Sequence, residues 1–352
     1  MSSPIARGGG LALAAACAFG VTAPLVKRYG VDLGPFGTAA LLYAGAVVGA
    51  IVPLPLAPAS GAPLTTRELP RVGLVALFGA FVAPACLAWG VQHTSVTVAS
   101  LLLNLESVFT VVLMAAFYGE HVGGRTGPAL GVMAVGGALL VFAQANEGGR
   151  TSVLGAVAVA IATLAWAADN ALTRPLAELE PSRVVMAKGA MGAVLACVVA
   201  RLSGEPMASP GAAFALVLCG AFGYGASLRL YLAAQRTLGG ARTASIFAAA
   251  PFVGALVAVA LGDRPPLLGT TVAAALCAFG VFLHLTEHHA HAHTHLAVSH
   301  EHAHRHDDGH HDHVHVPAFE GEHSHPHDHG AVTHEHEHAP DVHHAHEHEG
   351  PE

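Results

Sequence analysis

Apolar residues fill most of residues 1–286 in long stretches, and short breaks rich in Pro, Gly and charged residues separate the stretches. About 20 apolar residues are needed to cross a bilayer as a helix. The pattern therefore predicts ten membrane-spanning helices, near residues 10–28, 34–56, 71–92, 96–118, 126–144, 152–173, 184–202, 210–233, 243–261 and 267–285. Ten spans leave only short loops, so this part of the chain has no room for a soluble catalytic domain.

The two halves of the apolar region repeat at an offset of about 143 residues. Each copy contains five predicted helices, and an odd number reverses the second copy in the membrane. We therefore expect an all-α integral membrane fold with two inverted five-helix repeats, residues 1–145 and 146–286, an arrangement common in transporters that use alternating access. The matching segments are Phe109 with Gly119-Glu120 against Phe252 with Gly262-Asp263, and Ala99-Ser100 against Ala244-Ser245.

Residues 287–352 have a different pattern, in which His alternates with Ala, Glu, Asp or Pro. The segment has no apolar period, so it cannot bury a core and is expected to be disordered. Imidazole binds zinc, nickel and cobalt well, and neighbouring carboxylates add oxygen ligands. We predict that this tail binds such divalent metals through its closely spaced histidines: His291, His293, His295, His300, His302, His304, His306, His310, His311, His313, His323, His325, His327 and His329.

Metal binding need not be the tail's function. The tail could simply solubilise the chain, or it could sense pH, because 24 of the 27 histidines lie in it and titrate near pH 6.5. Two strings, at residues 300–304 and 334–338, match the H-E-x-x-H motif of metalloproteases. That motif needs a helix in a closed site, which a disordered repeat does not offer, so the protease interpretation is rejected.

Composition and charge divide at the same boundary. The whole chain is 53% hydrophobic and 11% charged, against about 25% charged in an ordinary soluble domain. Residues 1–286 carry a net charge of +5 and residues 287–352 a net charge of −13 with neutral His. Lys and Arg number eight on one side of the predicted spans and five on the other, which favours cytoplasmic termini in a plasma or inner membrane. The bilayer is thus the expected partner, and nothing indicates nucleic acid.

Ionisable residues inside the predicted spans are the candidate chemistry, because such residues are costly in lipid and usually face a cavity or a partner. Glu106 lies near the middle of the fourth span, the best position for a substrate or proton site. Asp169, Lys188 and Arg229 fall toward one end of their helices, where a substrate role and an ion-pair cluster that pins helices together are equally open. Asn104 and Asn170 accompany the acids.

Small residues and prolines indicate packing and bending. The pairs Gly45–Gly49 and Gly127–Gly131 have the spacing that lets helix backbones approach closely. Pro24 and Pro251 lie within spans and free backbone carbonyls, so each is a candidate gate or hinge, with a static kink as the alternative for Pro251. The five cysteines are irregularly spaced in apolar runs, which argues against a disulfide framework.

Five short motifs in the apolar region carry a family resemblance: Leu105-Glu106-Ser107-Val108-Phe109, Trp166-Ala167-Ala168-Asp169-Asn170, Lys188-Gly189, Gly223-Tyr224-Gly225 and Ala250-Pro251-Phe252. With them, nearly all of residues 10–285 resembles the EamA-like members of the drug/metabolite transporter superfamily. The chain departs from the family pattern at Ser107, where proline is common, at Phe19, where Trp is common, and at Asp263, which replaces a Glu.

This resemblance implies ten helices in two inverted repeats, cytoplasmic termini and export of a small metabolite, amino acid or drug. It adds Trp166 and Tyr224 to the candidate substrate residues. The leading hypothesis is a secondary transporter of a metabolite or amino acid that needs no cofactor. The alternatives are a nickel, cobalt or zinc transporter and a membrane-anchored metal buffer or sensor without transport. We expect no enzyme, because no nucleophile, phosphate loop or embedded metal motif is present; a homodimer remains open.

Overall fold

The structure is a computed structural model and describes residues 4–51, 62–119, 122–147, 149–176, 179–238, 240–285, 290–295, 298–304, 323–329 and 332–337. Among these residues, nine helical stretches are long and apolar enough to cross a membrane, and Pro35–Ile51 is a shorter apolar helix. All ten predicted spans correspond to one of these stretches within a few residues. The all-helical membrane fold is therefore confirmed for residues 4–285 where they are described.

The first repeat begins with two helices separated at Val21 and continues through four further spans. Its elements are α1 (Pro4–Gly20), α2 (Thr22–Tyr29), α3 (Pro35–Ile51), α4 (Leu69–Val75), the π-helix η1 (Ala76–Val82), α5 (Ala83–His93), α6 (Val96–Leu102), α7 (Leu105–Tyr118) and α8 (Thr126–Glu147).

The second repeat has the same order of elements, except that its first span is unbroken. Its elements are α9 (Gly149–Thr173), the 3₁₀ turn η2 (Arg174–Leu176), α10 (Pro181–Leu202), α11 (Pro210–Gly220), the π-helix η3 (Ala221–Ala226), α12 (Ser227–Leu238), α13 (Gly240–Phe247), α14 (Ala250–Ala260) and α15 (Leu267–Leu285).

The irregular segments of the two repeats coincide. The π-helices η1 and η3 interrupt the third span of each repeat, and the fourth span of each is broken, between α6 and α7 and between α13 and α14. The fourth spans also end alike: Gly119 and Gly262 both have positive φ, +67° and +100°, a conformation that suits glycine. The weak sequence repeat therefore reflects a real structural duplication.

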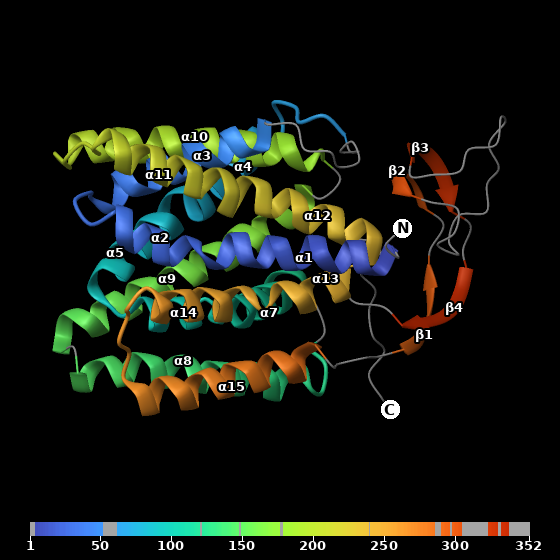
Figure 1. The fold of residues 1–352 in the computed structure, drawn as a ribbon. Helices are drawn as coiled ribbons and strands as arrows, with labels where there is room; N and C mark the ends of the chain where they lie inside the picture. Colours follow the sequence, from blue (N-terminus) through green and yellow to red (C-terminus); the bar gives the residue numbers. More distant parts are fainter. Residues whose placement is uncertain are drawn as a thin grey trace.

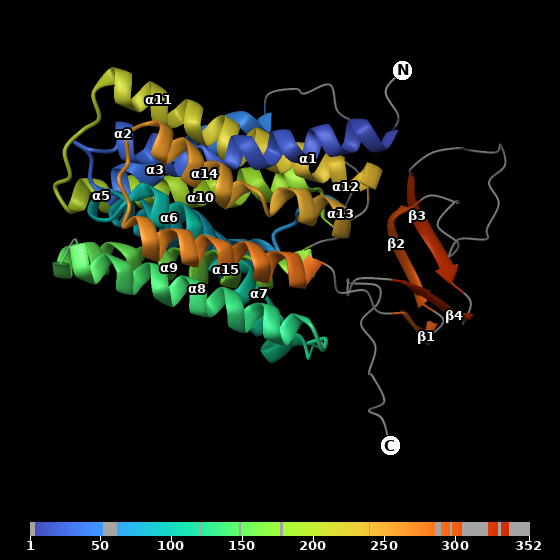
Figure 2. The ribbon, with the colours of Figure 1, turned by 60° about the horizontal axis from the view of Figure 1, so that its bottom comes forward.

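Corresponding helices of the two repeats pack against each other. Helix α3 lies against α10 and α8 against α15 (Figure 1). The crosswise contacts also match, since α1 packs on α12 as α9 packs on α5, and α3 packs on η3 as α10 packs on η1. The start of α1 and the end of α15 lie at the same end of the bundle, as an even number of spans requires (Figures 1 and 2).

Glycine packing confirms one predicted motif and contradicts the other. A Cβ on Gly45 would lie 2.0 Å from the Val217 carbonyl oxygen, and one on Gly49 would lie 2.2 Å from that of Ala221, so α3 approaches the second repeat too closely for alanine. A Cβ on Gly127 or Gly131 would meet nothing within 4 Å. The predicted close packing through the second pair is wrong, because no described residue of the chain approaches either glycine closely.

The tail contains four strands among its described residues, which differs from the disorder expected there. β1 (Ala290–His295) pairs antiparallel with β4 (Val332–Glu337), and β2 (Val298–His304) pairs antiparallel with β3 (His323–His329). Strict alternation of residue types has the period of a strand, and pairing satisfies the backbone without a core. Of the predicted metal ligands, His306, His310, His311 and His313 lie outside the described residues.

Candidate functional site

Glu106 lies where the fourth span is broken. Helix α6 ends at Leu102, α7 begins at Leu105, and Glu106 occupies the first turn of α7. This position is near the middle of the 23-residue span Val96–Tyr118. The amide groups of a helix's first turn favour negative charge, so the break itself supplies a place for a carboxylate inside the membrane.

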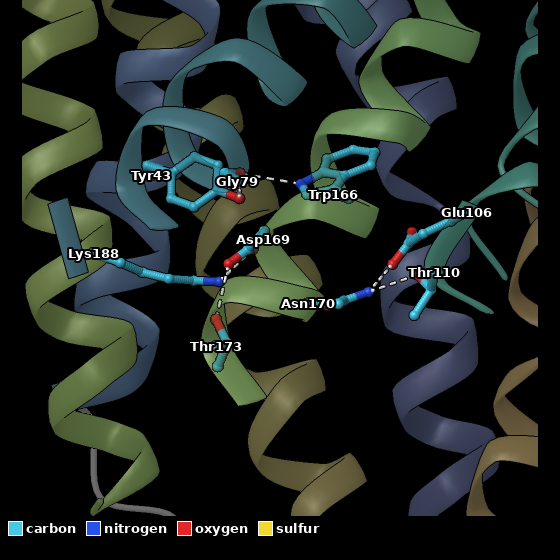
Figure 3. Close-up of polar contacts among 9 residues, drawn as sticks. All are labelled: Tyr43, Gly79, Glu106, Thr110, Trp166, Asp169, Asn170, Thr173 and Lys188. Carbon is cyan, nitrogen blue, oxygen red and sulfur yellow. Dashed lines mark hydrogen bonds and ion pairs between the residues drawn. The ribbon is translucent and has the colours of Figure 1, made fainter. Parts of the chain in front are cut away.

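Asn170, on α9, is the observed partner of Glu106. Its Nδ2 donates to Glu106 Oε1 at 2.9 Å and makes a longer contact of 3.4 Å with Thr110 Oγ1 (Figure 3). Asn170 is exposed and Glu106 is partly exposed, so a water-sized molecule can reach this pair. Within the described part of the chain, no Lys or Arg forms an ion pair with Glu106. The contact joins the two repeats.

Asp169 and Lys188 form an ion pair on the other side of α9. Lys188 Nζ donates to Asp169 Oδ2 at 2.7 Å, and Thr173 Oγ1 donates to Asp169 Oδ1 at 3.1 Å (Figure 3). The side chains of Lys188 and Asp169 are 18% and 6% exposed. A Cβ on Gly79 of η1 would lie 2.0 Å from Asp169 Oδ2, so only glycine leaves room for the carboxylate.

The π-helix η1 contributes a carbonyl group to the site. The Gly79 oxygen accepts hydrogen bonds from Tyr43 Oη and, at 3.1 Å, from Trp166 Nε1 (Figure 3). The wider turn of a π-helix leaves carbonyl oxygens less well paired than an α-helix does, and such segments are frequent at functional sites. The bulge thus ties α3 and α9 together beside the ion pair.

Aromatic rings from two further positions, Tyr224 and Phe19, complete this region. Tyr224 of η3 stacks on Tyr43, with ring centroids 5.4 Å apart, and Phe19 of α1 meets Tyr224 edge-on at 5.9 Å. Trp166 lies 6.3 Å from Tyr224 and 6.4 Å from Phe19. The two π-helices therefore face one aromatic cluster, which we define as Phe19, Tyr43, Trp166 and Tyr224.

The structure separates the other predicted residues from this region or gives them local roles. Arg229 donates to the Gly49 carbonyl at 3.4 Å and has further interactions, and the described ion pair of this region joins Asp169 and Lys188. Asn104 donates to Leu101 O at 2.8 Å and stabilises the break between α6 and α7.

The two predicted hinge prolines lie next to breaks in their spans. Pro24 is in the first turn of α2, after the break at Val21, and Pro251 is in the first turn of α14. A role for either in gating stays a prediction.

Sequence reasoning missed Tyr43, Gly79, Thr110 and Thr173. Each is an ordinary residue for a membrane helix. The sequence repeat gave the one available indication of Gly79. This residue and Tyr224 lie in segments that correspond at the repeat offset, and both segments are π-helical in the structure. Phe19 was noticed only as a departure from the family pattern.

Comparison with known proteins agrees with this architecture. The model of the EamA-like transporter family matches residues 6–143 and 153–286, one match for each repeat. The chain belongs to the EamA-like transporter family. A solved structure titled "Crystal structure of protein" is 19% identical, with a TM-score of 0.54, over 80% of this chain and 97% of that chain, and supports the fold alone. No curated protein matches. The EamA-like chain is therefore an integral membrane transporter of small solutes.

Proposed function

We propose that this EamA-like protein is a secondary transporter that exports a small metabolite or amino acid by alternating access, with the solute contacting Glu106 and Asn170. The observation that carries the proposal is the hydrogen bond between these two side chains at the break of the fourth span. Broken helices at the interface of inverted repeats are where transporters of this kind bind substrate.

The accessibility of the pair supports this assignment. A carboxylate and an amide facing lipid in mid-membrane would cost several kcal/mol. A water-sized molecule can nevertheless reach both Glu106 and Asn170. Their accessible surface is therefore best explained as part of a polar path, with Glu106 available either to a solute or to a coupling proton. The adjacent aromatic cluster would form an apolar wall of that path.

The proposal is tested by counterflow in proteoliposomes, with the twenty protein amino acids offered singly as radiolabelled solutes. Glu106→Gln removes the charge while keeping the shape, and should abolish counterflow while the protein stays monodisperse. Glu68→Gln is the matched control, because Glu68 lies outside the spans and bonds to Thr65 beside it. Wild-type rates in Glu106→Gln would remove this residue from the site.

We propose a second function for the tail, the binding of zinc, nickel or cobalt at the cytoplasmic side. The register supports it, because His300, His302 and His304 are Cα partners of His327, His325 and His323, and His291 and His293 are partners of His336 and His334. Imidazole is a good ligand for these ions, and the Asp and Glu residues that alternate with His add carboxylate oxygens. Residues 1–286 hold only three of the 27 histidines, which favours metal as a tail ligand over metal as the transported solute.

Equilibrium dialysis against ⁶⁵Zn²⁺ tests the tail, with the full chain compared with a chain that ends at residue 286. The full chain should bind several ions and the shortened chain fewer than one. Amino-acid counterflow should persist in the shortened chain. Uptake of ⁶⁵Zn²⁺, ⁶³Ni²⁺ or ⁵⁷Co²⁺ into proteoliposomes by the shortened chain would instead favour a metal transporter.

A further inference from the structure

Asp263 makes a dense set of hydrogen bonds between the two repeats. It lies in the loop after α14, and its Oδ2 accepts from Ser95 Oγ at 2.6 Å, Thr97 N at 2.8 Å and Thr97 Oγ1 at 2.6 Å. These donors form the first turn of α6, which belongs to the other repeat. Asp263 therefore caps a helix that is distant in sequence. The contact lies at one end of the bundle, here called the latch end, which is formed by residues 30–34, 94–95, 203–209 and 261–266 (Figure 1).

The electrostatics favour an ionised carboxylate at this position. Burial by itself raises the pKa of Asp263, but the hydrogen bonds from Ser95 and Thr97 outweigh it, and the pKa lies below its usual value. Three positive features surround the group: the N-terminus of α6, the Lys27 ammonium of α2, and Arg264, whose side chain bonds to the Asp263 carbonyl. Hydrogen bonds to a charged acceptor are among the stronger ones in proteins.

Helices α6 and α14 are closely packed below this contact. A Cβ on Gly254 of α14 would lie 2.9 Å from Ser100 Oγ of α6 and 2.7 Å from the Gly20 carbonyl of α1. All seven residues of α6 are buried. Helices α6 and α14, one half of each broken span, thus meet directly beneath the latch end.

The remaining halves of the broken spans are arranged differently. Helix α7 packs against α8 and α9, whereas α13 packs against α1 and α12. By the symmetry of the repeats, the packing of α6 on α14 corresponds to a packing of α13 on α7, but in the described part of the chain α7 and α13 do not pack extensively on each other. The two broken spans therefore meet mainly through α6 and α14.

We propose that Asp263 is a gating residue: its bonds to Ser95 and Thr97 hold the latch end closed in this conformation, and they break when the site opens toward that end. The proposal rests on the proposed transport function, because it assigns a step of the transport cycle to a residue outside the solute site. Asp263 is thus a positioning residue that acts through α6 and α14.

Hydrogen exchange in lipid nanodiscs tests the latch without any solute. Asp263→Asn keeps the shape but removes the charge and replaces one acceptor by a donor, so amide exchange in Val96–Leu102 should become at least about tenfold faster. Glu205→Gln is the control, since Glu205 caps α3 at the same end through Phe36 N at 3.3 Å and Gly37 N at 2.7 Å. It should accelerate exchange at the start of α3 and leave α6 unchanged. Unchanged exchange of α6 in Asp263→Asn would overturn the proposal.

A reversible cross-link distinguishes a gate from a static cap. Ser95→Cys combined with Asp263→Cys is treated with a short bifunctional methanethiosulfonate reagent, and counterflow is measured with the amino acid that the wild type exchanges fastest. Cross-linking should stop counterflow, and reductant should restore it. The reagent should not change the counterflow rate of the wild type, which has five native cysteines, or of either single variant, since none of these proteins can form the cross-link.

The outcomes separate the two proposals. Counterflow at the uncross-linked rate in the cross-linked double variant would show that this contact need not open, and would refute the gate. If the wild type exchanges none of the amino acids, the proposed amino-acid transport fails, and the exchange rate of α6 still decides whether Asp263 holds the latch end closed.

Discussion

The ion pair between Asp169 and Lys188 gives the sharpest test of how the site is built. Both groups are largely buried, and their contact distance is 2.7 Å. Lys188→Met removes the ammonium while keeping the length of the side chain, and leaves the Asp169 carboxylate without a counter-charge beside Gly79. Asp169→Asn leaves the ammonium unpaired in the same way. The combined variant removes both charges.

The expected magnitudes differ strongly between the single and double variants. Removing one partner of a buried pair costs about 3–5 kcal/mol, whereas replacing both is often nearly neutral. The remaining 18% exposure of Lys188 lets solvent reduce the penalty of an unpaired charge, so we expect each single variant near about 3 kcal/mol. The double variant should recover most of that loss and lie within about 1 kcal/mol of the wild type, which corresponds to a coupling of about 5 kcal/mol between the two positions.

Unfolding in mixed micelles with increasing dodecyl sulfate measures these free energies, with the fluorescence of the two tryptophans as the signal. Single-variant losses below about 1 kcal/mol, or a double variant whose loss equals the sum of the two, would refute the buried-pair reasoning. Counterflow of the double variant then decides the open alternative for this pair. A stable and active double variant means that the pair only pins α9 to α10, and a stable but inactive one means that it also contacts the solute.

Three further predictions follow from other contacts. Gly220→Ala should destabilise the fold by about 1–3 kcal/mol or prevent its expression, because its Cβ would lie 1.8 Å from the Leu42 carbonyl oxygen. Gly211→Ala on the same helix is the control: its Cβ would meet nothing within 4 Å, so dodecyl sulfate unfolding should change little. Trp166→Phe should cost at least about 1 kcal/mol in that assay, followed by the fluorescence of the remaining Trp89, because it removes the donor to Gly79 O and shortens a buried side chain. No loss would show that the bond is unimportant. The stabilisation by the Asp263 carboxylate should be fully present above the unfolded pKa of about 4, and should be lost as the pH falls through the lower folded pKa. The difference in melting temperature between wild type and Asp263→Asn should therefore shrink in acid. A difference that grows in acid would contradict the lowered pKa.

The positions of the spans could be predicted because they depend on a local property. A run of about 20 apolar residues is enough to define a membrane helix whatever lies beside it. The duplication was likewise visible, although Gly119-Glu120 and Gly262-Asp263 were only a faint match. In the structure, both of these glycines have positive φ at the end of the fourth span of their repeat.

The membership of the site could be predicted only in part. Glu106 and Asn170 were singled out because polar groups are costly in lipid, but their contact depends on how α7 and α9 are rotated about their axes. Because helix rotation is not visible in the sequence, we grouped Arg229 with Asp169 and Lys188. In the structure, the Arg229 side chain donates a hydrogen bond to the Gly49 carbonyl near the end of α3. The spacing of Gly127 and Gly131 likewise predicted a contact that α8 does not make.

The sequence alone therefore determined that this chain is a ten-span membrane protein with a duplicated core and a histidine-rich tail, because hydrophobicity and residue alternation are read along the chain. Only the tertiary structure decided which side chains meet: the pairing of Glu106 with Asn170, the aromatic cluster between the two π-helices, and the bonds from Ser95 and Thr97 to Asp263. The hydrogen bonds among these contacts join residues 64 to 168 positions apart. Helix tilt, rotation and the loss of regular turns determine such contacts, rather than composition.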